Sequence, residues 1–396
     1  MSDSILVFSR STPHHHTGGM ETLIWSLAVQ WAELGCRVRM VTTTLPGRAG
    51  PFREDDVEVV PLPGTAPGRY SSGWWVATRD YWLSQPTPPR AVLSVSAGAY
   101  SVARARARHP RIPFVLQAHG TSAMEIRSKL RAGDLRSLVG APKNVAGLMR
   151  DLGRYRDFDR IVAVGQKVAA SLTAAPQRWS IPPGRVRLIP NGVRPAEHGF
   201  DPGARRDIRN TLGITDRMVV VSCVGRLHVQ KRLDRVLRAA ARLRDWGEGD
   251  RFRFLLVGDG PDEPRLRAIV RDLNLTDLVT FVGRVKPGQV RGYHAAADVA
   301  LLTTARLEGL PMTVLEALAS GLPCVVPTGV IGSPALDPVL LQVDPRDDEQ
   351  LATVLRSMVP TAQARNSRLP AEFTLEHCAR SYLALFEELR GAHLAP

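Results

Sequence analysis

The 396-residue chain has no long hydrophobic run and no recognisable export signal. No uninterrupted apolar stretch approaches the roughly 18–20 residues that a membrane-spanning helix needs. The N-terminus carries Asp3 and then enters an apolar stretch at once, without the basic region or cleavage site of a signal peptide. An apolar fraction of 44% and a charged fraction of 23% are typical of soluble globular proteins, so we expect a cytoplasmic protein.

Cysteine is also scarce, and its spacing argues against a covalent or metal framework. The four cysteines are widely separated and stand in apolar surroundings: Cys36, Cys223, Cys324 and Cys378. Disulfide frameworks and zinc sites need cysteines at short, regular spacings, which this sequence does not contain. We therefore expect four reduced thiols that pack in the protein interior.

Lysine is nearly missing from an otherwise basic chain. Only five of the 52 basic residues are lysine, and the formal net charge is +14. A basic surface attracts the phosphates of nucleotides, anionic lipids and nucleic acids alike. The sequence lacks the interleaved basic and aromatic stripe that single-strand binders use, so we expect no nucleic-acid partner. Peripheral contact with an anionic membrane at the inner face stays open as an expectation.

What the chain does contain is a regular alternation of strand and helix patterns. Short runs that are apolar throughout predict parallel strands covered by helices on both faces of a sheet. In the first half these runs are 5–9, 37–43, 57–61, 91–95, 114–117, 161–164 and 186–189. In the second half they are 219–224, 252–257, 280–282, 299–303 and 324–326. The fold class is therefore predicted to be α/β with two doubly wound, Rossmann-like domains.

The break between the two patterns falls near 194–202, a stretch with proline and glycine. We expect an N-terminal domain over 1–196, a C-terminal domain over 197–373, and a final helical segment over 374–396. Two doubly wound domains that face each other across a cleft bind ligands at the carboxyl ends of their strands. The motifs described next all follow the end of a predicted strand.

The most informative motif lies between residues 301 and 327. A buried strand is followed by a loop and then by Glu308-Gly309-Leu310-Pro311, which has the chemistry of a helix start, with Pro311 at the first helical position. The free amides of such a start, including those near Met312 and Thr313, form a site for an anion such as a phosphate. Glu308 and Glu316 flank this site as carboxylates, which repel phosphate but accept hydrogen bonds from sugar hydroxyls. The motif therefore suits a ligand with phosphate and sugar parts.

Three further strand ends carry residues that suit a polar ligand. Gly18 and Gly19 stand at a strand-to-helix turn, where glycines let a ligand approach the backbone. His119 follows the strand 114–117 and is predicted to point into the cleft, with a packing histidine as the alternative. Arg226 and Lys231 share one loop and can neutralise a diphosphate leaving group, whose charge grows in the transition state. The alternative for this pair is two exposed surface cations without a ligand.

Two motifs could indicate a metal site, and we expect that neither does. His14, His15 and His16 are adjacent, so their side chains point in different directions, and we expect a solvated loop near the acceptor. Asp157 and Asp159 form an Asp-x-Asp pattern, which in some transferases holds a divalent cation. This pattern precedes its strand and so lies at the amino end of the sheet, away from the ligand. We interpret Asp159 as structural and expect a metal-independent protein.

Taken together, these motifs resemble the signature of the retaining glycosyltransferases of family 4, also called glycosyl transferases group 1. The family's usual form is Glu-Gly-Phe-Gly-Leu followed by a Leu-Glu-Ala helix. This chain keeps both glutamates, Gly309 and the 315–317 triplet, and has Leu310-Pro311 where Phe-Gly is usual. The Gly-Arg-x4-Lys spacing also matches, although Arg232 stands where the family has glycine. Because Pro311 has no amide, a neighbour must make any contact that the family makes there.

The resemblance implies a GT-B fold and a donor site for a nucleotide diphosphate sugar, here a UDP-sugar such as UDP-GlcNAc or UDP-glucose. It implies that the final helix crosses back to the first domain, and that the leaving phosphate takes the acceptor proton. The catalytic candidates that it implies are His119 and Glu308. The donor-binding candidates are Gly18, Gly19, Arg226, Lys231, Val285, Glu308, Gly309, Leu310, Pro311, Met312, Thr313 and Glu316.

The resemblance does not fix the acceptor. A carbohydrate, an aminocyclitol of antibiotic assembly and a lipid-linked sugar all remain open, and the segment 121–145 lies where family members recognise theirs. Two other functions also stay open on the same fold. One is a hydrolysing UDP-sugar epimerase, and the other is a non-catalytic binder of nucleotide sugars.

Overall fold

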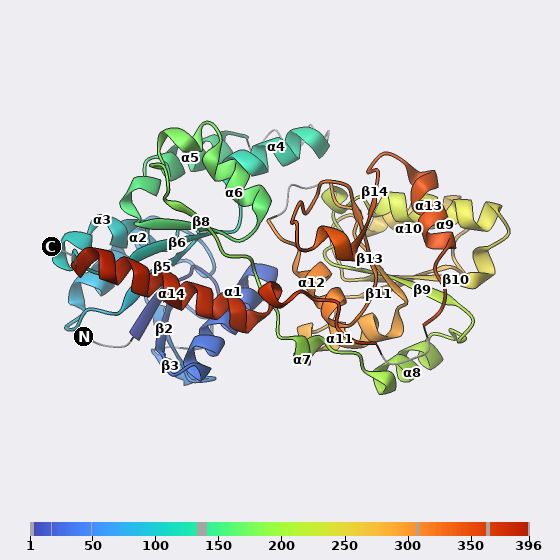
Figure 1. Ribbon diagram of the computed structural model, residues 1–396, viewed down its shortest axis with the longest axis horizontal. Coiled ribbons are helices and arrows are strands. Elements are labelled where there is room, and N and C mark those ends of the chain that lie inside the picture. Colours follow the sequence, from blue (N-terminus) through green and yellow to red (C-terminus); the bar gives the residue numbers. More distant parts are fainter. Residues whose placement is uncertain are drawn as a thin grey trace. The chain divides into compact units, whose positions relative to one another are not determined.

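The computed structural model describes residues 4–16, 18–48, 50–132, 141–305, 309–361 and 365–394; at 128–132, 141–144 and 394 it describes the backbone alone. It divides into two compact units. The first takes in Met1–Ile126, Val139–Gly192 and Leu375–Pro396, and the second takes in Arg127–Leu138 and Val193–Thr374. Each unit is a sheet covered by helices (Figure 1). None of the described helices is long and apolar enough to cross a lipid bilayer.

The sheet of the first unit has eight strands in the order β3-β4-β2-β1-β5-β6-β7-β8. All neighbouring strands are parallel except β3, which runs antiparallel to β4. The strands are β1 Ser4–Phe8, β2 Arg37–Thr43, β3 Phe52–Glu54, β4 Val57–Leu62, β5 Ala91–Val95, β6 Phe114–Ala118, β7 Arg160–Ala163 and β8 Val186–Leu188. The helices are α1 Gly19–Glu33, α2 Ser72–Ser84, α3 Tyr100–Arg104, α4 Ser122–Ala132, α5 Ala141–Leu152, α6 Gln166–Thr173 and α14 Leu375–Leu394.

The sheet of the second unit has six strands in the order β11-β10-β9-β12-β13-β14, and all neighbours are parallel. The strands are β9 Val219–Val224, β10 Phe252–Val257, β11 Val279–Gly283, β12 Val299–Leu301, β13 Cys324–Pro327 and β14 Leu340–Val343. The helices are α7 Pro195–His198, α8 Pro202–Thr211, α9 Leu233–Asp245, α10 Glu263–Asp272, α11 Pro287–Ala296, α12 Met312–Ala319 and α13 Asp348–Arg356. The α/β class predicted from the sequence is confirmed.

Both faces of the second sheet are buried, which explains why its strands are apolar throughout. Along β9, Val219 and Val221 pack in the core beneath α9, α10 and α13, whereas Val220 packs in the opposite core beneath α12. Along β10, Phe254 and Leu255 divide between the same two cores. Successive side chains of a strand point to opposite faces, so a strand covered on both sides needs apolar residues at every position.

The C-terminal helix α14 belongs to the first unit and lies beside α1 (Figure 1). Tyr382 and Phe386 are fully buried and pack against Trp31 of α1, with ring centroids 5.7 and 6.0 Å away. The indole N–H of Trp31 donates to the carbonyl of Ala379 at 3.1 Å. Burial of large side chains contributes about 1.5–3 kcal/mol each, so this helix is a substantial part of the core of the first unit.

A buried ion cluster fixes the start of β12 in the second unit. Asp298 is 1% exposed and accepts hydrogen bonds from Arg205 at 2.9 Å and from Arg209 at 3.2 Å. Arg205, Arg209 and Arg365 also donate to carbonyls at the end of α11, including that of Ala297 for two of them. These contacts satisfy helix-end carbonyls that have no partner within the helix. They hold α8 and α11 against the strand that leads to the candidate site.

All four cysteines are free and buried, as the sequence predicts. The elements also differ from the prediction at two sheet edges. β3 and β14 were not predicted, because both are short and carry exposed or polar residues. β3 joins β4 through Asp55 and Asp56, which have φ angles of 48° and 61°. Two such residues form the tight turn that a hairpin of two short strands requires.

Candidate functional site

In the second unit, the strand order reverses between β9 and β12. Strand β9 is the first in sequence and has β10 on one side and β12 on the other. Ligands of doubly wound sheets bind outside the carboxyl ends of the strands at such a point. The loop after β9 carries Arg226 and Lys231, and the loop after β12 leads to Gly309 and the helix α12. The topology therefore places the predicted donor motifs of the second unit on neighbouring loops.

Glycines allow the loops after β9 and β10 to approach each other closely. Gly258 has a φ angle of 132°, and a Cβ atom there would lie 2.1 Å from the carbonyl oxygen of Gly225. A Cβ atom at Gly260 would lie 2.2 Å from the carbonyl oxygen of Leu227. The Leu227 amide donates to the carbonyl of Asp259 at 2.8 Å. Side chains at the two glycines would push these loops apart, so glycine is needed at both positions for the observed loop geometry.

Arg226 and Lys231 line one pocket. Residues from both strand ends complete its wall: Cys223, Val224, Gly225, Leu233, Leu301, Leu302 and Thr303. The Thr303 hydroxyl donates to the Lys231 carbonyl at 2.8 Å, which ties the loop after β12 to the loop after β9. Arg226 is exposed and makes no ion pair or hydrogen bond with any described residue. Its guanidinium is thus available to an anionic ligand.

Arg232 adopts the left-handed conformation that explains why the related motif has glycine at this position. Its φ and ψ angles are 52° and 39°. The guanidinium donates to the carboxylate of Asp234 at 3.2 and 3.3 Å. Left-handed backbone costs a residue with a side chain roughly 1–2 kcal/mol. The loop therefore keeps its geometry without the glycine, and the ion pair offsets part of the strain.

Helix α12 begins at Met312, one residue later than predicted. Pro311 has φ and ψ angles of −68° and 117°, so it is extended and precedes the helix, and the prediction that it is the first helical residue is wrong. The first amides of a helix have no partner within the helix, so those of Met312 and Thr313 remain available to a ligand. Leu310 is buried in the core and Gly309 is half-buried. Glu308 lies outside the described residues.

Glu316 lies inside α12 and is half-buried. It makes no ion pair or hydrogen bond with any described residue, and burial raises the pKa of its carboxyl group to about 7. An unpaired carboxyl in such a setting gains from a ligand that supplies hydrogen-bond donors. Val285, the remaining donor-site candidate of this unit, is half-buried after β11. β10 separates β11 from β9, so Val285 is farther along the same sheet edge.

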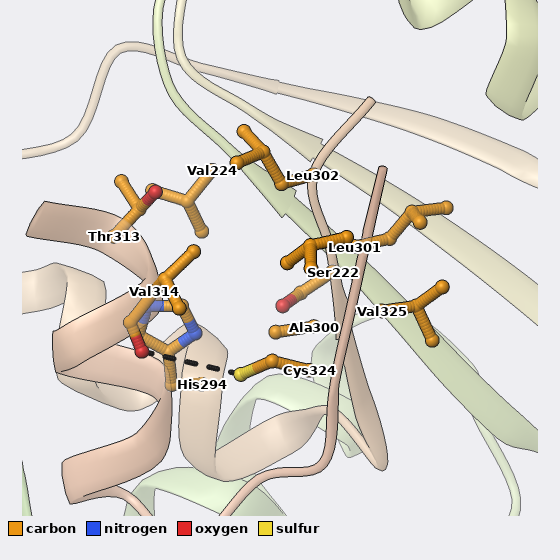
Figure 2. A pocket seen from close by; sticks show the side chains of 11 residues that line it. Ser222, Val224, His294, Ala300, Leu301, Leu302, Thr313, Val314, Cys324 and Val325 are labelled. Carbon is orange, nitrogen blue, oxygen red and sulfur yellow. Dashed lines mark hydrogen bonds between the residues drawn. The ribbon is translucent and has the colours of Figure 1, made fainter. Parts of the chain in front are cut away.

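A buried polar pair lies behind the first turn of α12. Figure 2 shows the pocket, in which Ser222 of β9 and His294 of α11 face the same space beside Thr313 and Val314. Both side chains are 1% exposed, and neither the Ser222 hydroxyl nor either His294 ring nitrogen has a hydrogen-bond partner among the described residues. Burial lowers the pKa of His294 to about 3, so this ring is neutral. Sequence motifs did not reveal this pair, because its two residues come from elements that are far apart in the chain.

In the first unit, the loop after β1 folds over a buried carboxylate. Gly18 precedes α1 in extended conformation, and Gly19 is its first residue. Glu21 is 5% exposed and accepts a hydrogen bond from the Ser11 hydroxyl at 2.7 Å. A Cβ atom at Gly18 would lie 2.5 Å from the Glu21 carboxylate, so the glycine leaves room for it. Sequence reasoning did not assign Glu21 to the site, although it stands in the Gly-Gly-x-Glu motif that could have identified it.

His119 is half-buried at the end of β6 and belongs to a short hydrogen-bonded chain. Its Nε2 lies 3.0 Å from Oε1 of Gln117, and the amide nitrogen of Gln117 donates to the hydroxyl of Tyr382 at 2.9 Å. Burial lowers the pKa of His119 to about 4, although the charge of Glu21 opposes this shift. The ring is therefore neutral at pH 7, with Nε2–H donating to Gln117 and Nδ1 left as an acceptor.

The histidine run differs from the expectation. His14 is half-buried, with its ring 5.0 Å from the ring of Trp25 and 5.2 Å from that of Phe52. Nε2 of His15 lies 2.9 Å from the hydroxyl of Thr43. The expectation of a solvated loop is wrong for these two histidines, because the hairpin β3–β4 and strand β2 cover them. The described residues hold no cluster of three or more metal-ligand side chains.

The Asp-x-Asp motif has structural contacts. Asp159 accepts two hydrogen bonds from Arg106 at 3.0 and 3.1 Å and one from the Phe114 amide at 2.8 Å. Asp157 lies 3.8 Å from Arg154 in an ion pair. Asp159 thus fixes the amino ends of β6 and β7, in agreement with the structural interpretation.

Two family models match the chain in adjacent halves. Glycosyltransferase Family 4 matches residues 17–197, and Glycosyl transferases group 1 matches residues 204–336. Among curated proteins, a D-inositol 3-phosphate glycosyltransferase of Geodermatophilus obscurus is 27% identical over 95% of this chain and 86% of its own length. A protein of the same name from Acidothermus cellulolyticus is 30% identical over 64% of this chain, which spans about half (52%) of that relative.

Other similar proteins cover nearly the full length. A 2-deoxystreptamine glucosyltransferase of Streptomyces kanamyceticus is 25% identical over 94% of this chain and 99% of its own. The sucrose-phosphate synthase structure from Thermosynechococcus elongatus has a TM-score of 0.79 and 20% identity, covering 99% of this chain and 100% of its own. HepE from Anabaena in complex with UDP-glucose has a TM-score of 0.66 and 16% identity, covering 98% of each chain.

The two family models, the topology of both sheets and the motifs at their carboxyl ends agree. The chain therefore belongs to the glycosyltransferases of group 1, family 4, and has the two Rossmann-like units of the GT-B fold.

Proposed function

We propose that this glycosyltransferase moves a hexose from a UDP-sugar to a hydroxyl of its acceptor, with retention of the anomeric configuration. The observation that carries the proposal is the pocket at the end of β9, where Arg226 and Lys231 share one wall. Glu316 on the neighbouring helix α12 is half-buried and has no described partner. These groups suit a diphosphate joined to a hydroxyl-rich sugar. The HepE structure with UDP-glucose supports the choice of nucleotide by analogy of fold.

The proposed roles follow from charge and position. Arg226 and Lys231 stabilise the diphosphate, whose negative charge increases as the bond to the sugar breaks. The first amides of α12 supply further donors near the leaving group. We propose that Glu316 accepts hydrogen bonds from the ribose and that the backbone near Val285 holds the nucleobase. Glu308 and Gly309 are proposed to contact the transferred sugar.

His119 is proposed to bind the transferred sugar rather than to act as a base. Its pKa of about 4 makes it a weak proton acceptor at neutral pH, but its neutral Nδ1 can accept a hydrogen bond from a sugar hydroxyl. In the proposed front-face reaction, the leaving diphosphate oxygen takes the proton of the acceptor hydroxyl as the new bond forms. Gly18 and Gly19 are proposed to let the donor phosphates approach the start of α1.

For the acceptor, we propose a cyclitol or aminocyclitol. The names of the relatives refer to D-inositol 3-phosphate and to 2-deoxystreptamine, both polyhydroxylated six-membered carbocycles. We propose that the reaction takes place in the cytoplasm. We also propose that it needs no metal ion, because two cations and the start of a helix can stabilise the diphosphate. A role in glycan or aminoglycoside assembly is consistent with this acceptor class.

A donor and acceptor screen by mass spectrometry tests the proposal. UDP-glucose, UDP-GlcNAc and GDP-mannose are each incubated with 2-deoxystreptamine, D-inositol 3-phosphate and no acceptor. We expect a mass gain of one hexose or N-acetylhexosamine on a cyclitol with a UDP-sugar, and an axial anomeric linkage in the product. Turnover with GDP-mannose but with neither UDP-sugar would contradict the UDP assignment. Conversion of UDP-GlcNAc without acceptor would identify a hydrolysing epimerase instead.

A further inference from the structure

A second pocket, which none of the predicted donor residues lines, lies among the helices of the first unit. It has a volume of about 580 Å³. Its walls come from α2, α3 and the end of α5: Trp75, Val76, Arg79, Tyr100, Ser101, Arg104, Ala105, Arg150 and Arg154. This volume is in the usual range of small-molecule sites, which is about 300–1,000 Å³. The lining combines aromatic rings with four guanidinium groups.

The aromatic part of the pocket is rigid. The ring of Trp75 stacks on that of Tyr70 at 5.2 Å and 15°, and on that of Tyr100 at 6.3 Å and 14°. The Tyr70 hydroxyl donates to the carbonyl of Val95 at 3.2 Å, and the Tyr100 hydroxyl donates to Asp151 at 2.9 Å. Both neighbours of Trp75 are therefore fixed. A preorganised flat surface binds an apolar group at a low cost in conformational entropy.

Trp75 differs from the buried tryptophans of the same helix. The indole N–H groups of Trp74 and Trp82 donate to the carbonyls of Gly98 and Ala105, both at 3.1 Å. Trp75 is only half-buried, and its N–H has no partner among the described residues. Trp74 and Trp82 are thus fully part of the core, whereas Trp75 packs on Tyr70 and Tyr100 and leaves part of its ring exposed at the pocket.

Only two of the four arginines of the pocket pair with a described acid. Arg79 pairs with Asp80 at 3.0 Å and Arg154 pairs with Asp157 at 3.8 Å. Arg104 and Arg150 are exposed, and neither makes an ion pair or hydrogen bond with a described residue. The Arg150 guanidinium lies 5.8 Å from the centroid of the Trp75 ring.

Asp151, which follows Arg150 in the chain, makes no ion pair with it. Asp151 accepts hydrogen bonds from the Tyr100 hydroxyl at 2.9 Å and from the Ser122 hydroxyl at 2.7 Å, so both its oxygens are engaged. Burial raises the pKa of the Asp151 carboxyl group, whereas the hydrogen bonds from Ser122 and Tyr100 and the charge of Arg150 lower it. Like charges gathered around an apolar floor repel one another, and an anion relieves that repulsion. Guanidinium groups suit phosphate oxygens because their donors form a planar fork.

We propose that this pocket binds an organic phosphate with an apolar portion. The phosphate would contact Arg104 and Arg150, and the apolar portion would lie on Trp75 and on Val76, whose side chain is 50% exposed. Such a group is found in an anionic lipid and in a soluble phosphate ester. If the ligand is an anionic lipid, this pocket is the site of the membrane contact that the net charge suggests. This proposal is tested independently of the transfer reaction, because binding is measured without donor or acceptor.

The test is isothermal titration calorimetry of the full chain with n-octyl phosphate, inorganic phosphate and n-octyl glucoside. We expect saturable binding of octyl phosphate that is at least about tenfold tighter than either of the other two probes. Arg104→Gln with Arg150→Gln, and separately Trp75→Ala, should each weaken octyl phosphate binding by about tenfold or more. Arg108→Gln with Arg111→Gln removes the same charge from exposed positions outside the pocket and should leave the affinity unchanged.

Three results would overturn the proposal: no binding of octyl phosphate, equal binding of all three probes, or equal losses in the pocket variants and the control variant. Circular dichroism and thermal melting confirm that each variant is folded. Flotation with phosphatidylglycerol and phosphatidylcholine vesicles then separates the two sources of the ligand. Retention on the anionic vesicles that is lost in the pocket variants identifies a lipid, and its absence in a chain that binds octyl phosphate identifies a soluble ester.

Discussion

Burial controls the chemistry of the polar side chains at the strand ends. His119 is kept neutral by a pKa of about 4, and Glu316 has a pKa of about 7, so neither behaves like its free side chain in water. Arg226 is exposed, and a guanidinium group is a permanent cation at neutral pH. A cation that stays charged suits a leaving diphosphate, whereas neutral or half-protonated groups suit hydroxyls of a sugar. These properties are consistent with the separate roles that we propose for Arg226, Glu316 and His119.

The contact between Gln117 and His119 yields a prediction about the transferred sugar. Gln117→Met keeps the volume but removes the acceptor that orients the imidazole, so the kcat/KM for the UDP-sugar should fall by about tenfold, or 1.4 kcal/mol, typical of a lost buried hydrogen bond. The Kd for UDP should not change, because UDP lacks the sugar that His119 is proposed to hold. Tyr382→Phe should have a smaller effect, since the amide remains. An unchanged kcat/KM in Gln117→Met would show that this chain does not position His119.

Arg232 yields a prediction about stability. Arg232→Gly removes left-handed strain but also loses the ion pair with Asp234, and glycine gains entropy in the unfolded chain, so the terms nearly cancel. We expect its free energy of unfolding to stay within about 1 kcal/mol of wild type. Arg232→Val places a β-branched residue in the same conformation and should cost about 2 kcal/mol. Urea denaturation measures both variants, and equal stability of the two would contradict the assigned backbone conformation.

At the scale of elements, sequence patterns predict those features that depend on residues close together in the chain. Strands such as β9 and β10 were placed with the observed bounds, because a strand buried on both faces must be apolar throughout. The motif loops were also predicted, since their glycines and prolines act within a few residues. The hairpin strand β3 was missed because Asp55 and Asp56 replace the usual glycine. The contact of Gln117 with Tyr382 joins positions 265 residues apart, and no local pattern reveals it.

The helix α14 yields the element-scale prediction. Truncation after Arg368 removes the buried side chains of α14, including Tyr382, Phe386 and Leu389, and exposes the apolar face of α1. At about 1.5–3 kcal/mol for each large side chain, the loss is comparable to the whole stability of a domain. We expect insoluble or inactive protein in an expression and activity assay. Truncation after Arg390 is the control and should stay soluble, whereas full activity of the shorter chain would refute the role of α14.

At the scale of the whole molecule, both units repeat one arrangement. Each is a largely parallel sheet whose strand order reverses beside its first strand, β1 or β9, and each has one of its motif loops directly after that strand. The sequence predicted this plan from the repeated alternation of strands and helices. It did not predict the pocket around Trp75 and Arg150, because its lining comes from three separate helices whose surface residues follow no sequence motif.

Metal independence is a prediction for the whole enzyme. If Arg226, Lys231 and the start of α12 hold the diphosphate as proposed, the initial rate should be nearly the same with and without EDTA. Asp157→Asn should be almost silent. Asp159→Asn should lower the free energy of unfolding by about 1–3 kcal/mol, because it weakens the contacts with Arg106 and the Phe114 amide. A rate that EDTA abolishes and that Mn²⁺ or Mg²⁺ restores would show that these cations do not suffice.

The most direct test of the proposed donor site is the kcat/KM for the UDP-sugar in Arg226→Ala. Arg217→Ala serves as a control, since Arg217 is an exposed arginine of the same unit that does not line the pocket. If Arg226 stabilises the leaving diphosphate, its removal should cost on the order of 2–4 kcal/mol, a fall of about 30- to 1,000-fold, and should weaken UDP binding. The control should keep wild-type activity. A folded Arg226→Ala enzyme with more than about a tenth of wild-type kcat/KM would contradict the account.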